Sequence, residues 1–227
     1  MVLGIETATV VCGAALVHDG AVRAIRELQQ PHVHAERLPG LIGSVLQEAG
    51  IGPGGLEGVA VSTGPGSFTG LRIGLSTAKG LVFATGTPLV SVSTLEALAM
   101  RLVRSGECGE GWILAVLDAR RDEVYAQLFR VSDDRLEPAD EVRDLTTDRL
   151  AGVIAQRPVV VTGDGAEKAG SALDVAGCMF RLAPAELRTC TAAEVGLLGE
   201  RMLRSGLRAD PVTLEPQYIK EFFLKVR

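Results

Sequence analysis

The sequence is poor in aromatic residues, with one Trp, two Tyr and six Phe among 227 residues. It contains 27 Gly, so the composition favours a core that packs small side chains closely over one anchored by large rings. Apolar residues make up 47% and charged residues 22% of the chain, which is typical of a folded globular protein and argues against disorder. The length suffices for one large domain or two small ones.

Cysteines are also few, and Cys12, Cys108, Cys178 and Cys190 form no CxxC pair. They are too sparse for a disulfide framework, which indicates a reducing compartment. The chain does not open with a basic segment followed by an apolar core, and no apolar run reaches the length of a transmembrane helix. We therefore expect a cytoplasmic protein with no membrane partner.

A net positive charge is missing as well, because the formal charge at pH 7 is -5. This charge argues against a chain that binds nucleic acid through its overall electrostatic field, although a local basic patch could still be present. If the function involves RNA, we expect a partner protein to hold it.

The first half of the chain predicts three strands followed by alternating helices and strands. Asp19-Gly20 is a strong two-residue hairpin motif that joins the second and third strands. The predicted strands cover 2–5, 10–17, 21–28, 58–62 and 89–92, and the predicted helices cover 35–49, 69–83 and 94–104.

The second half begins to repeat this order after a short polar segment, 105–111. Its predicted elements are a hairpin at 113–117 and 123–131, helices at 144–155 and 191–205, and strands at 158–161 and 179–182. This pattern predicts a duplicated α/β unit with a shared cleft, divided into an N-terminal domain (1–106) and a smaller C-terminal domain (107–227).

Residues 62–74, STGPGSFTGLRIG, join a predicted strand to a predicted helix through a glycine-rich turn. Such a turn points backbone N–H groups and the positive end of a helix dipole into one space, as phosphate-binding loops do. However, Leu71 stands where a Walker loop has lysine, and the glycine spacing differs from the dinucleotide fingerprint. The alternative is that these glycines permit close packing of backbones, and the spacing alone favours packing.

Five segments together resemble the bacterial TsaB (YeaZ) family: VLGIETAT, STGPGSFTGLRIG, VSTLEALA, LDARRDEVY and the late PQYIK. The resemblance implies an α/β fold of duplicated ribonuclease-H-like domains, as in actin-like and sugar-kinase-like ATPases, with mixed sheets flanked by helices. It also implies a noncatalytic subunit without a cofactor, which binds the paralogous transferase TsaD. TsaD makes N6-threonylcarbamoyladenosine next to the anticodon in tRNAs that read codons beginning with A. The ATPase TsaE joins the complex, tRNA is contacted indirectly, and the same surface forms a homodimer when TsaD is absent.

The resemblance places the partner interface on the helices predicted at 35–49 and 69–83. The interface residues expected there are His34, Arg37, Leu38, Leu41, Val45, Gly70, Arg72, Ile73, Gly74, Ser76 and Gly80. It also implies a vestigial nucleotide cleft, formed by Glu6, Thr7, Gly64, Gly66 and Asp118. For Glu6 and Thr7 the alternative is a polar turn that satisfies its own backbone.

Two departures from TsaD argue against catalysis. TsaD carries HMEGH, with paired histidines as metal ligands, where this chain reads Thr94-Leu95-Glu96-Ala97-Leu98. We therefore expect no metal here and place Glu96 on a solvated helix face. TsaD also has adjacent glycines in the hairpin turn that this chain fills with Arg120 and Arg121, which we expect to be solvated and neutralised by neighbouring carboxylates.

Two other functions remain as alternatives: an independent ATPase or small-molecule kinase of the same fold, and a glycoprotease-like metallopeptidase. The missing paired histidines argue against the peptidase. His32 and His34 are two residues apart and so do not share a helix face, which favours a role at an interface over metal binding. The amphipathic C-terminal segment, 216–227, is expected to pack back on its own chain.

Overall fold

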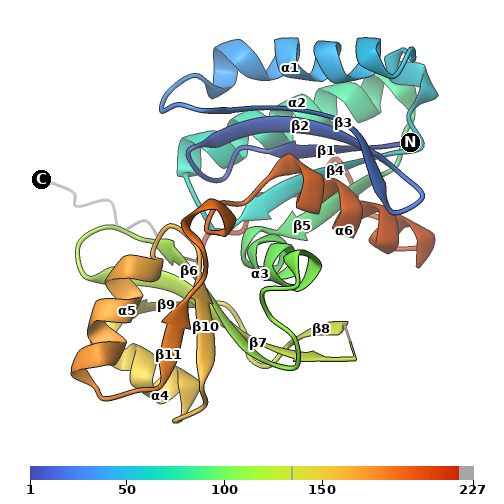
Figure 1. Cartoon of the computed structure of the whole chain (residues 1–227). Coiled ribbons are helices and arrows are strands. Elements are labelled where there is room, and N and C mark those ends of the chain that lie inside the picture. The colour runs from blue at the N-terminus through green and yellow to red at the C-terminus, as the bar shows by residue number, and fades with distance from the viewer. Residues whose placement is uncertain (134, 220–227) are drawn as a thin grey trace, which may run out of the picture.

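The computed structural model describes residues 1–133 and 135–219. The predicted amphipathic segment lies outside the described residues from residue 220 onward, including Phe222, Phe223 and Leu224. Figure 1 shows two sheets, one in each half of the chain, with helices between them and on their outer faces.

The elements agree closely with the predicted order in the first half. The strands there are β1 (Val2–Glu6), β2 (Val11–His18), β3 (Ala21–Gln29), β4 (Gly58–Gly64) and β5 (Leu89–Ser93). The helices are α1 (His34–Glu48), α2 (Phe68–Thr85) and α3 (Thr94–Ser105). The second half contains strands β6 (Gly111–Asp118), β7 (Glu123–Ser132), β8 (Arg135–Pro138), β9 (Arg143–Thr146), β10 (Val159–Thr162) and β11 (Phe180–Leu182). Its helices are α4 (Leu150–Ile154), α5 (Ala166–Val175) and α6 (Ala192–Arg204).

The predicted duplication is confirmed by the strand order of the two sheets. Within the described residues, the first sheet has the order β3-β2-β1-β4-β5, and the second has β8-β7-β6-β10-β11 when read in the same direction. In each sheet the central strand pairs antiparallel with the strand that follows it and parallel with the strand on its other side. The chain is therefore built from two copies of one α/β unit.

The prediction was wrong over residues 144–155, which were expected to form one helix. The first part of this segment is β9, which pairs antiparallel with β7, and the helical part is limited to a 3-10 turn at Thr147–Arg149 and the short helix α4. Strand pairing with β7 supplies backbone hydrogen bonds that local helix propensity cannot anticipate. The sequence analysis also missed β8 and α5.

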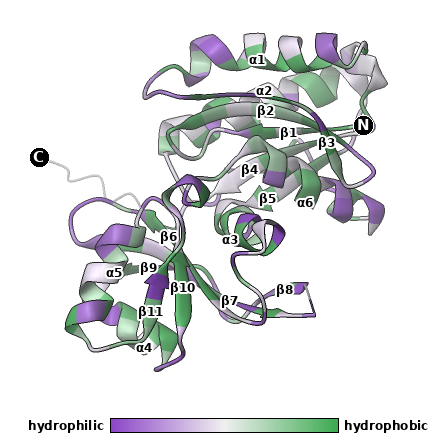
Figure 2. Ribbon diagram, in the orientation of Figure 1, coloured by the Kyte–Doolittle hydropathy of each residue, from purple (hydrophilic) through white to green (hydrophobic). Residues whose placement is uncertain are grey.

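Three hydrophobic clusters hold the layers together. One joins α1 and α2 to the outer face of the first sheet, and another joins α4 and α5 to the outer face of the second. The third lies between the sheets, where α3 and α6 pack. Figure 2 shows hydrophobic residues along the central strands and hydrophilic residues mainly on loops and helix surfaces.

The last helix of each half packs against the sheet of the other half. Leu95, Leu98 and Leu102 of α3 join the cluster that contains Ile113 and Phe129 of the second sheet. Helix α6 packs on β1, β2 and β4 of the first sheet. Packing therefore crosses the predicted division at residues 106 and 107, and the division itself stays a prediction.

Helix α6 approaches β1 backbone to backbone. A Cβ on Gly4 would overlap the carbonyl oxygen of Ala192 and would lie 2.5 Å from the Gly196 nitrogen. Gly199 packs against the methyl group of Ala60 in β4, which a Cβ on Gly199 would overlap. Glycine is required at these contacts because any side chain would push the helix away from the sheet.

None of the described helices combines the length and apolar composition needed to cross a bilayer.

Gly4→Ala is expected to lower the free energy of unfolding by about 1–3 kcal/mol, because the added methyl group overpacks the contact with α6. Gly43→Ala is the control, since Gly43 lies in α1 with open space around it, and alanine there should stabilise the helix by up to about 1 kcal/mol. Chemical denaturation of both variants measures the difference, and equal stabilities would contradict the packing argument.

Candidate functional site

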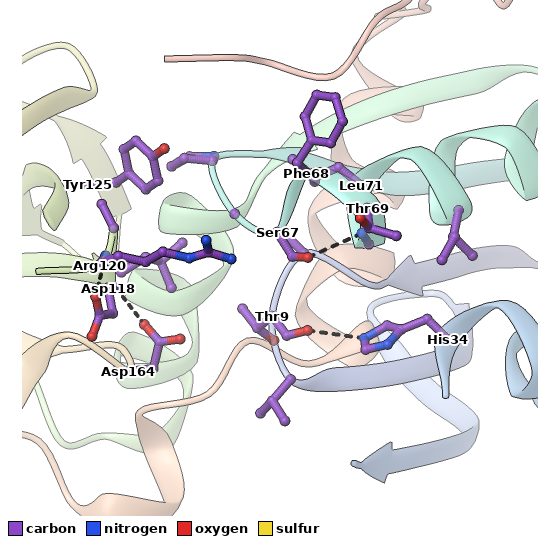
Figure 3. A pocket seen from close by; sticks show the side chains of 18 of the residues that line it. Thr9, His34, Ser67, Phe68, Thr69, Leu71, Asp118, Arg120, Tyr125 and Asp164 are labelled. Carbon is purple, nitrogen blue, oxygen red and sulfur yellow. Dashed lines mark hydrogen bonds between the residues drawn. The ribbon is translucent and has the colours of Figure 1, made fainter. Parts of the chain in front are cut away.

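A cleft of about 900 Å³ lies between the two halves of the chain. Its walls come from the turn after β1, the first residues of α2, the turn between β6 and β7, and residues 217–219. Figure 3 shows these segments facing one another, with Ser67 and Phe68 on one side and Asp118, Arg120 and Tyr125 on the other. The duplicated units thus form the shared cleft that the sequence predicted.

The glycine segment serves close packing within the chain. A Cβ on Gly66 would overlap the Ala8 carbonyl oxygen, and one on Gly70 or Gly74 would overlap Thr7. Helix α2 therefore lies directly against the turn that follows β1. Ser67 caps the helix by accepting a hydrogen bond from the Gly70 N–H at 3.3 Å.

Glu6 is fully buried and is not among the residues that line the cleft. Its Oε1 accepts hydrogen bonds from the backbone N–H groups of Ala8 at 2.7 Å and Thr9 at 3.2 Å. The Cys190 thiol donates to its Oε2 at 3.2 Å. Burial raises the pKa of Glu6 to about 7, although these hydrogen bonds oppose the shift. For Glu6 the structure therefore agrees with the alternative from the sequence, a polar turn in which the side chain binds its own backbone.

Of the five residues predicted for the nucleotide cleft, Gly66 and Asp118 line it. Glu6 and Thr7 are fully buried, and Gly64 packs against Gln217. The prediction is corrected for these three residues, because they are engaged in packing and turn hydrogen bonds inside the chain. Lining residues that the prediction missed include Thr9, His32, Phe68, Tyr125 and Asp164. Asp164 could have been found from the duplication, since its turn follows β10 as the glycine turn follows β4.

The turn between β6 and β7 keeps a backbone shape that favours glycine. Arg120 and Arg121 have φ values of 73° and 49°, in the left-handed region. The Lys168 ammonium donates to Asp118 Oδ1 at 2.7 Å and to the Arg121 carbonyl at 2.6 Å. We expected Asp118, Asp122 and Glu123 to neutralise the two arginines; for Asp118 this is corrected, because its carboxylate pairs with Lys168. Figure 3 shows the Arg120 side chain extending into the cleft.

The two aspartates of this cleft wall differ in their ionisation. Burial raises the pKa of Asp164, which accepts the Asp118 N–H at 2.9 Å. Burial also acts on Asp118, but the hydrogen bonds from Lys168 and from the Arg120 N–H outweigh it and lower the pKa of this carboxyl group. Asp118 thus remains charged and tied to its own lysine.

The positions that the resemblance assigns to the paired histidines of TsaD are buried in this chain. Thr94 and Leu98 are fully buried, and Leu98 belongs to the cluster between the sheets. Glu96 is half-buried, and burial raises its pKa, so its expected place on a solvated face is corrected. These three residues present no set of metal ligands to solvent.

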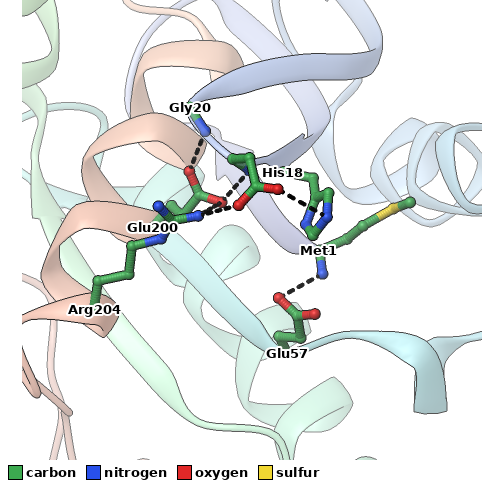
Figure 4. A network of polar contacts seen from close by, with 7 residues as sticks. Met1, His18, Gly20, Glu57, Glu200 and Arg204 are labelled. Carbon is green, nitrogen blue, oxygen red and sulfur yellow. Dashed lines mark hydrogen bonds and ion pairs between the residues drawn. The ribbon is translucent and has the colours of Figure 1, made fainter.

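The residues of the described ranges bring one group of three potential metal ligands together: His18, Asp19 and Glu200. Figure 4 shows that this group belongs to a polar network which fastens the hairpin of β2 and β3 to α6. Glu200 accepts the backbone N–H groups of Asp19 and Gly20, each at 2.7 Å. Arg204 binds both Asp19 and Glu200, so the carboxylates already have a cationic partner.

The predicted partner interface separates into buried and exposed members. His34, Leu38, Val45, Gly70 and Gly74 are buried within the chain. Leu41 and Ile73 are half-buried, and Arg37, Arg72, Ser76 and Gly80 are exposed. His34 Nε2 lies 3.1 Å from the carbonyl oxygens of both Thr9 and Val11, which fixes the start of α1 against β2. Only the exposed and half-buried members can contact another protein.

Comparisons with known proteins agree with this architecture. The family model for TsaD, tRNA N6-adenosine threonylcarbamoyltransferase, matches residues 29–221. The tRNA threonylcarbamoyladenosine biosynthesis protein TsaB of Escherichia coli K12 is 40% identical over 124 residues, which are 55% of this chain and 52% of that protein. This chain thus spans about half the length of the curated relatives it matches.

Solved structures extend the likeness to nearly the whole chain. YeaZ from Pseudomonas aeruginosa has a TM-score of 0.80 and 27% identity, and the match covers 96% of this chain and 98% of that one. An inorganic polyphosphate/ATP-glucomannokinase from an Arthrobacter species has a TM-score of 0.51 at 17% identity, covering 89% and 98% of the two chains. The second likeness shows the fold alone, which is that of the actin-like and sugar-kinase-like ATPases.

Glu6→Gln is expected to remove a pH dependence of stability. Burial raises the folded-state pKa from 4.5 to about 7, so the folded state binds the proton more tightly than the unfolded state. The free energy of unfolding should therefore fall by roughly 3 kcal/mol at most as pH rises from 4.5 to 7. Glutamine keeps an acceptor for the turn and carries no charge. Denaturation across this pH range should show a flatter profile for Glu6→Gln, whereas the exposed control Glu110→Gln should keep the wild-type slope.

Proposed function

Because the chain belongs to the TsaB (YeaZ) family, we propose that it is a noncatalytic subunit that binds and supports TsaD. The complex transfers threonylcarbamoyl to N6 of the adenosine next to the anticodon, in tRNAs that read codons beginning with A. This chain supplies a surface that TsaD binds, and TsaD supplies the reactive groups.

The observation that carries this proposal is the burial of Thr94 and Leu98. A catalytic metal needs lone-pair donors that face an open site, whereas Thr94 is fully buried and Leu98 lies in the core between the sheets. The cleft walls support the same conclusion, since Glu6 serves its own turn and Asp118 is tied to Lys168. The chain offers a binding surface without the machinery for transfer.

We place the partner surface on the outward face of α1 and α2. Figure 1 shows both helices on the outer face of the first sheet, and the N-terminal residues of both also border the cleft. Arg37, Arg72, Ser76 and Gly80 are exposed there, and Phe83 near the end of α2 is 63% exposed. Small residues let helices approach closely, and an exposed aromatic ring is a common anchor.

The remaining parts of the proposal concern the assembly. TsaE joins through the complex, and tRNA is held mainly by the other subunits, because this chain has a formal charge of -5. The outward face of α1 and α2 also supports a homodimer when TsaD is absent, since isologous contacts use one surface twice. The complex acts in the cytoplasm.

The direct test is transfer of threonylcarbamoyl to unmodified tRNA in a reaction with TsaD, TsaE, ATP and threonylcarbamoyl-adenylate, with and without this chain. We expect transfer to require the chain and expect none from the chain alone. Transfer that is indifferent to the chain would overturn the proposal. ATP turnover by the purified chain alone would favour the independent kinase or ATPase.

Gly80→Arg is expected to abolish copurification with TsaD while leaving the chain folded. Gly80 is exposed in α2 with open space around it, so the arginine blocks close helix approach without an internal clash. Gly152→Arg in α4 is the matched control, because that glycine is also exposed with open space but lies on the second half. Gly74→Arg is unsuitable for this test, because a side chain there would collide with Thr7 inside the chain. Pull-down by TsaD and circular dichroism measure the two properties, and retained pairing of Gly80→Arg would contradict this placement.

A further inference from the structure

Residues 209–219 cross the edge of the first sheet and reach α2; we call this segment the strap. It starts with a hydrogen bond from the Ala209 N–H to the Leu89 carbonyl at 2.8 Å, and Leu214 packs against the cluster under α1 and α2. The Gln217 N–H then donates to the Thr63 carbonyl at 2.7 Å. The strap is thus fixed at β5, in the core and at the end of β4 before it meets the helix.

The strap meets α2 at a cluster of Phe68, Arg72 and Tyr218. The Arg72 Nε donates to the Tyr218 hydroxyl at 2.9 Å. The guanidinium carbon of Arg72 lies 3.8 Å from the centre of the Phe68 ring, and the ring centres of Phe68 and Tyr218 are 5.2 Å apart. One ring lies under the guanidinium and the hydroxyl binds one edge of it, so both contacts restrict the rotamers of an otherwise exposed arginine.

The held guanidinium belongs to the outward face of α2. Arg72, Ser76 and Gly80 follow one another at helical spacing along that face, and all three are exposed. Among the described residues, no carboxylate forms an ion pair with Arg72, and the hydrogen bond to Tyr218 uses its Nε and not its Nη groups. An arginine that is already ordered loses less side-chain entropy on binding than a mobile one.

We propose that the strap orients Arg72 for the partner subunit, with Tyr218 as the positioning residue and a carboxylate of TsaD as the group that Arg72 binds. The inference rests on the proposed function, because it takes the outward face of α2 as the TsaD interface. It assigns a role to the late PQYIK motif, which that function leaves unused. A planar guanidinium binds a carboxylate through two parallel hydrogen bonds, and this geometry requires a fixed orientation.

The test is a double-mutant cycle on the Kd of the complex with TsaD, using Tyr218→Ala, Arg72→Ala and the double variant. Each single change should weaken binding about tenfold, as for interface anchors, and the double variant should be no weaker than Arg72→Ala. Tyr218→Phe keeps the ring and removes the hydroxyl, so it should recover part of the affinity. The conservative Arg72→Lys should fail to restore it, because an ammonium lacks the planar fork.

Several outcomes would overturn this inference. Unchanged affinity of Tyr218→Ala, or losses that multiply to about a hundredfold in the double variant, would show that Tyr218 does not act through Arg72. Thermal unfolding of each variant without TsaD identifies a loss caused by general destabilisation, which would also count against the positioning role. If the wild-type chain does not bind TsaD, the proposed function fails and the strap role falls with it. If the wild-type chain binds TsaD and the variants bind it equally well, the strap role is wrong and the proposed function still stands.

Discussion

The close contact between α6 and β1 is the constraint on which the rest of the structure depends. Gly4 and Gly196 bring two backbones together without a side chain between them, so α6 lies directly on the first sheet. The same approach carries Cys190, just before α6, to the buried carboxylate of Glu6. The position of α6 thus fixes the residues that pack against the turn after β1.

The turn after β1 determines the position of α2 and of the outward face of that helix. Thr7 and Ala8 fill the space that side chains at Gly66, Gly70 and Gly74 would need, so the helix lies against the turn itself. The glycine motif therefore has a structural role without a phosphate ligand. A substitution in the buried turn would therefore displace α2 and its exposed residues, because close-packed interiors transmit strain.

The duplicated fold could be predicted because its signals are local. Asp19-Gly20 marks a hairpin, and the apolar stripe of α1 has helical spacing, so neither needs information from distant residues. The burial of Gly74 and Glu6 was not predictable in this way, since it depends on where α2 and Cys190 meet the turn. The same holds for Asp118, whose partner Lys168 lies 50 residues away on α5. Long-range contacts between residues of ordinary type leave no periodic pattern in a sequence.

The cleft shows how a fold can keep its shape while its chemistry changes. Its volume of about 900 Å³ suits a small ligand, and the fold is shared with kinases. Yet the carboxylates near this cleft already have partners, because Glu6 is buried in its own turn, Asp118 is held by Lys168 and Asp164 accepts the Asp118 N–H. Arg120 and the N-terminus of α2 face this space, and both are positive. The contacts of Ala8 and Thr7 with Gly66, Gly70 and Gly74 hold α2 beside this cleft whether or not a ligand occupies it, because they lie inside the close-packed chain.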